Sequence, residues 1–272
     1  MATAVAGGLA VGLMVTGAGC SSERVVVAGQ AAGDAVAELR GAADVLVRSG
    51  SSRVRTTVEM ATGGTRVAVR GHGGYDFVAQ RGRLKVVLPK DAAGVAEHEP
   101  VTELLATGAL FMRNRGEGVP ADKWVRVDTA GVSDGNLVTG GATDPLTAAE
   151  LLRAARHVSV IGDERLRGTA VRHYRGLTDI GRAARVASPG VREALGAAAK
   201  GFTEHAVAFD AYLDEQGRLR KIRHRFSVTN GWAGSGGRQD VASTTELYDF
   251  GAPVTVRLPE PADIYTGTVG SP

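Results

Sequence analysis

The chain has 272 residues, of which 43% are hydrophobic and 22% are charged, so it is long and apolar enough to bury a core. Its 27 arginines and 5 lysines are scattered along segments where they alternate with Val, Thr and Ala, and the formal net charge is only +3. A nucleic-acid-binding surface would instead gather basic side chains with aromatic stacking partners. Composition and charge therefore indicate a globular protein and exclude nucleic acid as an expected partner.

An export signal is predicted at the N-terminus. Residues 1–19 carry no charged side chain, and Leu9 to Val15 form a short apolar core followed by small residues. This run is too short to span about 30 Å of hydrocarbon, so a signal peptide is favoured over a permanent membrane helix. Cys20 is the only cysteine of the chain and has no disulfide partner, an oddity that lipidation would resolve.

The residues before this cysteine, Gly17-Ala18-Gly19, resemble a bacterial lipobox, in which a peptidase cuts before a cysteine that carries a thioether-linked diacylglycerol. The resemblance implies a signal peptide over 1–19, a lipidated tether over 20–33 and a single domain over 34–272. The protein would then be exported and lipid-anchored at Cys20 to the outer face of the cytoplasmic membrane. An ordinary signal peptide beside an incidental cysteine is the alternative.

The first half of the mature chain is predicted to be one helix followed by strands. Apolar residues recur at helical spacing over 34–48, and residues 53–60 alternate between apolar and polar side chains as in a half-buried strand. Gly63-Gly64, Gly73-Gly74 and Gly82 are interpreted as turns between short strands. The predicted strands are 53–60, 66–70, 75–80 and 83–88, with further apolar or alternating segments over 101–106, 109–113 and 123–127 after a loop over 89–100.

The second half returns to strands after a helix that starts at Asp144-Pro145, where a capping Asp precedes a Pro at the first helical position. The elements predicted after it are strands over 158–161, 164–167 and 169–176, helices over 178–186 and 189–200, strands over 204–214, 219–230 and 238–248, and an extended edge segment over 249–259. This order predicts an α+β fold with a large curved antiparallel sheet, a half-open β-barrel, and helices packed on its concave side.

No motif for catalysis or metal binding is found in the sequence. His-Glu-x-x-His, Gly-x-Ser-x-Gly and a phosphate-binding glycine loop are absent. The six histidines are far apart in the chain, and the one cysteine is assigned to the anchor, which leaves no pattern typical of a metal site. We therefore expect no enzyme activity, no cofactor and no metal.

Alternation in the strands predicts one apolar face of the sheet, for which two interpretations stay open. The face packs entirely against the helices, or small side chains on a curved sheet leave an apolar hollow that accepts an apolar ligand. For the second case, alternation alone selects the cavity-lining candidates Val58, Met60, Val69, Phe77, Val86, Phe111, Val125, Val171, Val207, Phe209, Ile222, Phe226 and Leu247.

The segment from Tyr248 to Val256, with Pro259, Pro261 and Ile264 after it, resembles the ending of actinobacterial lipoproteins of the LppX/LprG group. The Lys-Trp-Val-Arg-Val run that begins at Lys123, the central helix and the cysteine motif fall in the order that this group shows. The resemblance implies a LolA-like fold, a half-open antiparallel barrel closed on one side by helices, with an apolar cavity for lipids or acyl chains.

From these observations we expect a membrane-anchored envelope lipoprotein that binds a lipid or acylated ligand in a hydrophobic cavity, for transport or envelope assembly. The alternative function is a sensor or interaction module of the same fold, which binds and regulates an envelope protein partner.

Overall fold

The computed structural model describes residue 1 and residues 22–62, 65–88, 99–116, 118–138, 142–202, 204–229 and 238–267. Side chains of the first helix are described from residue 33 onward. The predicted signal peptide, apart from Met1, and the predicted lipidation site Cys20 lie outside the described residues.

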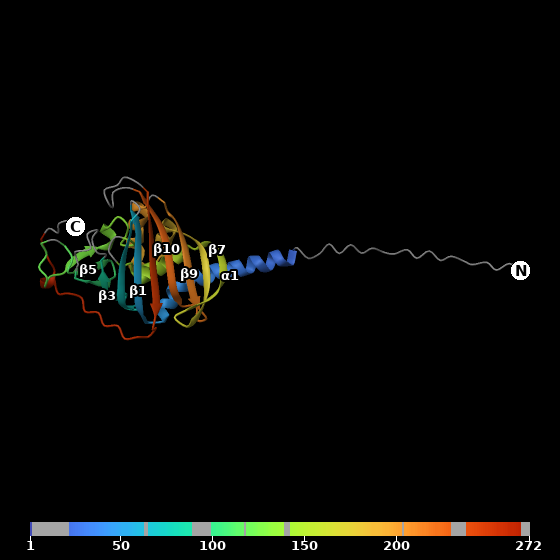
Figure 1. Cartoon of the computed structure of the whole chain (residues 1–272), viewed down its shortest axis with the longest axis horizontal. Coiled ribbons are helices and arrows are strands. Elements are labelled where there is room, and N and C mark those ends of the chain that lie inside the picture. Colours follow the sequence, from blue (N-terminus) through green and yellow to red (C-terminus); the bar gives the residue numbers. More distant parts are fainter. Residues whose placement is uncertain are drawn as a thin grey trace.

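A single antiparallel sheet of 11 strands forms the body of the protein, in the order β6-β5-β4-β3-β2-β1-β11-β10-β9-β8-β7 (Figure 1). The first and last strands of this order do not pair with each other, so the sheet stays open. The strands are β1 (Ser51–Thr62), β2 (Thr65–Asp76), β3 (Arg81–Val87), β4 (Val101–Ala106), β5 (Ala109–Arg113), β6 (Val125–Asp128), β7 (Arg156–Leu166), β8 (Thr169–Asp179), β9 (Ala206–Asp214), β10 (Leu219–Thr229) and β11 (Arg238–Tyr248).

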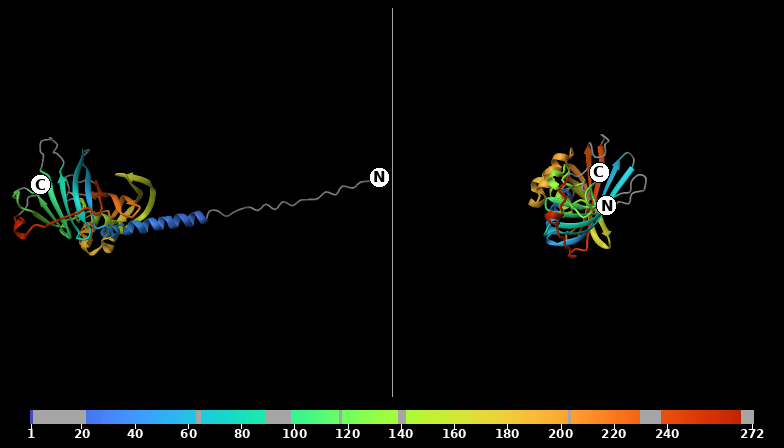
Figure 2. Two further views of the ribbon diagram at one scale, coloured as in Figure 1. Left: turned by 90° about the horizontal axis from the view of Figure 1, so that it is seen from below. Right: turned by 90° about the vertical axis from the view of Figure 1, so that its left-hand side faces the viewer.

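Helices cover one face of this sheet, here called the inner face, and the opposite face is called the outer face. The helices are α1 (Ser22–Arg48), α2 (Pro145–Glu150), α3 (Ile180–Val186) and α4 (Pro189–Gly201), with short 3-10 turns η1 (Thr129–Gly131), η2 (Leu151–Ala154) and η3 (Pro261–Asp263). Figure 2 shows α3 and α4, in gold, on the side of the molecule away from the tip of the β7–β8 hairpin. The predicted α+β class, a large curved antiparallel sheet with helices packed against it, is confirmed.

Strand β1 illustrates how alternation sets the two faces. Val54 and Val58 are buried on the inner face, while Arg53 and Arg55 are exposed on the outer face. Successive side chains of a strand point to opposite sides of the sheet, so the alternating sequence fixes which side meets the helices.

The predicted turn at Gly73-Gly74 is wrong, because both glycines lie inside the long strand β2. A Cβ atom on Gly73 would lie 1.9 Å from the carbonyl oxygen of Arg83 in β3, and one on Gly71 would lie 2.5 Å from Oγ1 of Thr56 in β1. These glycines therefore permit close approach of neighbouring strands, a second common use of glycine in sheets. The predicted meander of four short strands is three longer ones.

Two more glycines were also misassigned. Gly82 was predicted as a turn but lies within β3, opposite Tyr75 of β2. Gly162 does not separate two strands but lies within β7, where the pairing with β8 shifts register between Val160 and Gly162. Its φ of 155° and this shift mark a β-bulge, in which one extra residue bends a strand without ending it. Gly168, with a φ of 81°, occupies the predicted hairpin turn.

The helices agree with the predicted positions, except that α1 begins at Ser22 and not at residue 34, so the segment predicted as a tether is helical from Ser22 onward. The start of α2 is as expected, because the side chain of Asp144 accepts a hydrogen bond of 2.8 Å from the backbone N–H of Thr147. None of the described helices is long and apolar enough to cross a membrane.

The C-terminal residues 249–267, here called the C-terminal strap, do not lie along an edge of the sheet (Figure 1), as was predicted for the extended segment 249–259. The strap crosses the outer face from the end of β11 toward β6 (Figure 1), with Val254 close to Gly74 of β2. Near its end it bonds to β6 through Trp124, whose N–H donates to the carbonyl of Asp263 and whose carbonyl accepts from the N–H of Tyr265, both at 2.8 Å. Its side chains pack on a small outer cluster formed by Leu104, Ala109, Phe111 and Trp124.

Candidate functional site

Most of the predicted cavity-lining residues lie in packed clusters. Between the sheet and the α1 and α2 helices lie Val69, Phe77, Val86, Val125, Phe209, Ile222 and Leu247, and between the sheet and the α3 and α4 helices lie Val58, Val207 and Phe226. Val171 is buried near the start of β8, and Phe111 lies on the outer face under the strap. Met60 is partly buried and packs against both inner clusters. The structure therefore brings most of them together as core around the helices.

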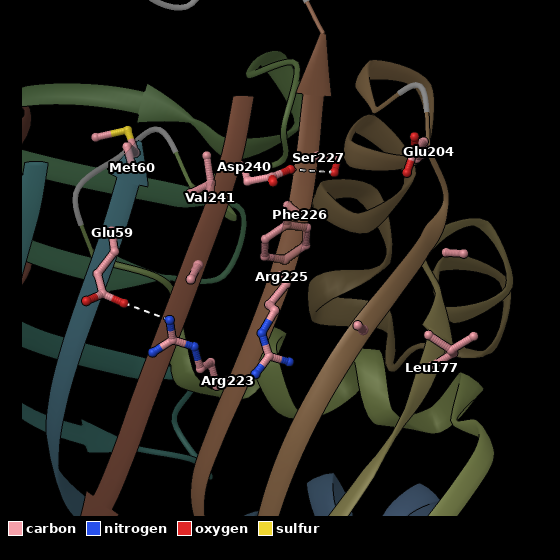
Figure 3. Close-up of a pocket in the computed structure, with 13 residues that line it drawn as sticks. Glu59, Met60, Leu177, Glu204, Arg223, Arg225, Phe226, Ser227, Asp240 and Val241 are labelled. Carbon is pink, nitrogen blue, oxygen red and sulfur yellow. Dashed lines mark hydrogen bonds and ion pairs between the residues drawn. The ribbon is translucent and has the colours of Figure 1, made fainter. Parts of the chain in front are cut away.

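A hollow of about 550 Å³ opens instead across five neighbouring strands, and of the predicted residues Met60 and Phe226 line it. We call it the outer-face hollow after its row of outer-face side chains, although Met60, Phe226 and Val241 of its lining form one row of the inner face. Its lining residues are Glu59, Met60, Leu177, Glu204, Ala206, Ala208, Arg223, Arg225, Phe226, Ser227, Asp240, Val241 and Ala242. Figure 3 shows these side chains on β1, β11, β10, β9 and β8, apart from Glu204, which lies on the segment before β9, and the helices lie behind the sheet.

Strand register explains why the hollow forms here. Leu177, Ala208, Arg225, Ala242 and Glu59 occupy consecutive positions in one row across β8, β9, β10, β11 and β1. The two alanines flank the single long side chain in the middle of the row, so there is little to fill the space above the sheet on either side of it. Small side chains at the centre of the row therefore create the depression.

The arginine of that row is turned toward the next row, where an acidic residue holds it. Arg225 Nη2 donates to Asp210 Oδ2 at 2.6 Å, and Arg175 Nε donates to Asp210 Oδ1 at 3.0 Å. His173 Nε2 lies 2.8 Å from the same Oδ1 atom. Burial raises the pKa of Asp210, but the hydrogen bonds from these three partners outweigh it and hold the pKa below its usual value. The carboxylate thus stays ionised and fixes the arginine beside the hollow.

Other charged groups at the hollow are also paired. Arg223 Nη2 lies 2.8 Å from Glu59 Oε2, and Ser227 Oγ donates to Asp240 Oδ1 at 2.9 Å, as the dashed lines in Figure 3 show. The hollow consequently combines an apolar wall of Leu177 and alanines with polar groups that are held in ion pairs or hydrogen bonds. Such a surface is suited to an amphipathic ligand, since pockets for small molecules are mainly apolar with a few placed polar groups.

The described part of the chain holds no group of three or more His, Cys, Asp or Glu side chains arranged to bind a metal ion. The hollow itself was missed at the sequence level, although its signal is present. Alternation in β9 puts Ala206 and Ala208 on the face opposite Phe209, but a small residue at a solvent-facing strand position is uninformative until the register puts Ala242 in the same row as Ala208, on the other side of Arg225.

No protein family matches the chain, and no curated protein matches it either. Among solved structures, the chain is similar to the lipoprotein LppX of Mycobacterium tuberculosis, at 12% identity and a TM-score of 0.45, over 82% of this chain and 97% of that one. It is also similar to LprF from Mycobacterium bovis, at 12% identity and a TM-score of 0.40, over 83% and 97% of the two chains.

A third similar structure is an outer membrane lipoprotein-sorting protein domain from Vibrio parahaemolyticus. It shares 10% identity with a TM-score of 0.31, over 81% of this chain and 92% of that domain. LppX, which gives its name to the group that the C-terminal segment resembles, is thus among the solved structures to which the chain is similar.

Proposed function

We propose that this protein is an exported lipoprotein of the cell envelope, anchored at Cys20 to the outer face of the cytoplasmic membrane. It binds a lipid or another apolar molecule for transport or envelope assembly. In this proposal residues 1–19 are removed as a signal peptide, residues 20–33 connect the lipid to the protein, and residues 34–272 form the binding domain.

The outer-face hollow is the observation that supports ligand binding. Its volume of about 550 Å³ falls within the range of small-molecule sites, roughly 300–1,000 Å³. Leu177 and the three alanines Ala206, Ala208 and Ala242 offer apolar contact, and Arg225 is held at the floor by Asp210. An acyl chain would cover the apolar wall while its polar end stays near the paired charges at the rim.

A second candidate function, an interaction module that regulates an envelope protein, is supported by the free edge of the sheet. Among the described strands, β7 pairs only with β8, and its side chains Val160 and Ile161 are 49% and 47% exposed. Unpaired edge strands with exposed apolar residues are sites where an extended segment of another protein can add to a sheet. A pull-down that yields one stoichiometric protein and no lipid would favour this function.

Binding of a fluorescent fatty acid to the purified protein tests the lipid-binding proposal. An Ala208→Phe substitution fills the hollow from a half-exposed position, so we expect a tenfold or greater loss of fatty-acid affinity and an unchanged thermal unfolding midpoint. Ala170→Phe is the matched control, because it adds the same ring at an exposed position of β8 outside the hollow. Equal affinity of both variants and the unmodified protein would contradict the proposal.

The anchor is tested separately by Cys20→Ser, which removes the thiol that would carry the diacylglycerol. We expect the protein to leave the membrane fraction of its host. Unchanged retention in that fraction would argue against lipidation at this cysteine.

A further inference from the structure

A second surface, away from the outer-face hollow, carries basic side chains whose placement has no evident structural purpose. It is the outer face of β1, β2 and β3, here called the basic face. Its basic residues are Arg53, Arg55, Arg70, His72, Arg83 and Lys85. All six side chains are exposed.

Register places these side chains against one another. Arg55, His72 and Lys85 are directly opposite each other in β1, β2 and β3, and Arg53 and Arg83 lie in the adjacent row with Gly74 between them. Neighbouring strands are about 5 Å apart, so Arg55 and Lys85 lie about 10 Å apart across β2, and so do Arg53 and Arg83. The arrangement therefore gathers positive charge on one surface of the sheet.

Acidic residues do not neutralise this charge. Within the described ranges, none of the six basic side chains has an ion pair with a carboxylate, and the nearest candidate by register, Glu246 opposite Arg55, pairs instead with Arg167 at 3.3 Å. The arginines at the outer-face hollow differ in this respect, because Arg223 and Arg225 are matched by Glu59 and Asp210.

The C-terminal strap turns part of the basic face into a small basin of about 270 Å³. The basin is bounded on one side by Pro253, Val254 and Thr255 of the strap. On the other side it is lined by Arg53, His72, Arg83 and Lys85, together with Gly73, Gly74 and Leu84. Every ionisable group in this lining is basic, which makes the basin complementary to an anion.

We propose that the basic face docks on a bilayer containing anionic phospholipids, with a headgroup phosphate entering the basin beside the strap. The basic side chains are spread across three strands and point to the same side of the sheet. They can therefore contact an extended negative surface such as an anionic bilayer. The basin lining contains no Phe, Tyr or Trp side chain on which a nucleic-acid base would stack. The docking is independent of what the outer-face hollow binds.

Flotation of the full chain with vesicles tests this docking. Cys20→Ser removes the lipid anchor in every protein compared, so any contribution of the N-terminal segment is constant. Vesicles of phosphatidylglycerol and phosphatidylcholine should bind the protein, and pure phosphatidylcholine should bind it far less. Substituting Arg53, Arg83 and Lys85 by Gln should lower the partition coefficient on the order of a hundredfold, given the attraction expected per cation near an anionic surface.

A matched control substitutes Arg182, Arg185 and Lys200 by Gln, which removes the same charge from the exposed surface of α3 and α4. We expect this control to bind within threefold of the parent protein and all variants to melt at similar temperatures. Two results would overturn the proposal: equal binding by the two triple variants, or full release from vesicles by millimolar inorganic phosphate, which would identify a free anion as the ligand.

Discussion

Glu103 is a buried acid on the inner face of β4, with an exposed fraction of 0%. Burial raises the pKa of Glu103 to about 8, although the charge of Arg115 acts in the opposite direction. The unfolded chain loses this proton near pH 4.5, while the folded chain keeps it until about pH 8. The stability that this group contributes is therefore complete below pH 4.5 and is lost as the pH rises to about 8.

Glu103→Gln should remove this dependence. We expect the free energy of unfolding of the variant to be nearly flat between pH 6.5 and 8, whereas that of the parent falls by about 2 kcal/mol over the same range. Urea titrations at several pH values measure it, with exposed Glu99→Gln as the control. A parent protein whose stability does not fall over this range would show that Glu103 ionises normally.

Phe209 decides between the two interpretations of the apolar face that the sequence left open. Its ring is fully buried, and a Cβ atom added to the opposing Gly176 would lie 2.8 Å from it. Phe209→Arg would bury an unpaired charge in this packed site, so we expect a loss of about 4 kcal/mol or more in the free energy of unfolding. The measurement is chemical denaturation, with Ala206→Arg on the exposed end of the same strand as control. A stable, folded Phe209→Arg variant would indicate a cavity at this point.

At the scale of elements, the C-terminal strap is held mainly through Trp124. Its indole packs in the outer cluster, Arg113 lies 4.5 Å from the ring centre, and the Lys123 ammonium donates to the carbonyl of Ala262 at 2.8 Å. Trp124→Ala should cost about 3 kcal/mol or more of stability and release the end of the strap. Hydrogen exchange should then become faster at the Tyr265 amide and stay unchanged in β9. Equal protection of Tyr265 in both proteins would show that the strap is held elsewhere.

The local sequence predicted helices and strands well where one sequence pattern was clear. The alternation of β1, the Asp-Pro start of α2 and the positions of α3 and α4 all appear as expected. The role of glycine was ambiguous, because a glycine can mark a turn or a close approach between strands. Gly73 is required by the close approach of Arg83 in the neighbouring strand, and the local sequence does not reveal that neighbour. The extent of α1 before residue 34 was missed, since that part of the helix shows no apolar periodicity of its own.

The candidate site was the least predictable feature, for a related reason. Alternation correctly assigned Phe209 and Phe226 to the inner face, but whether such a face is core or cavity depends on how closely the helices pack on it. The outer-face hollow depends on Ala208 and Ala242 being neighbours of Arg225 across three strands. Register of this kind arises from the whole sheet and not from any single segment.

At the scale of the whole molecule, several buried groups make the fold sensitive to acid. Burial lowers the pKa of His224 to about 3, so the unfolded chain binds a proton below pH 6.5 that the folded chain does not. For Asp210 and Asp214, burial raises the pKa but bonds to basic partners lower it further, so their contribution is present at neutral pH and lost as the pH falls below about 4. Between pH 6.5 and 4.5 the contribution of His224 opposes that of Glu103, so stability should fall most steeply below about pH 4.5, where Glu103 no longer changes its protonation.

His224→Leu removes the first of these contributions. We expect the variant to unfold at a lower pH than the parent, as followed by circular dichroism. The reason is that the unfolded chain of the variant can no longer be stabilised by binding a proton at this position. The control is His205→Leu, which changes an exposed histidine. A midpoint that moves equally in both variants would assign the effect to something other than burial.

The molecule thus divides its sheet into a face sealed by helices and a face that stays accessible. The sealed face supplies the core, and the accessible face carries the outer-face hollow near β10 and the basic face over β1 to β3. Together with the proposed anchor at Cys20, this division suits a protein that holds an apolar ligand close to a membrane.

Native mass spectrometry of the protein purified from its own host tests the central claim most directly. We predict a bound species with the mass of one lipid or other apolar molecule, present in the parent and in Ala170→Phe and lost in Ala208→Phe. A parent protein that carries no such molecule, or one whose occupancy is the same in both variants, would contradict binding in the outer-face hollow.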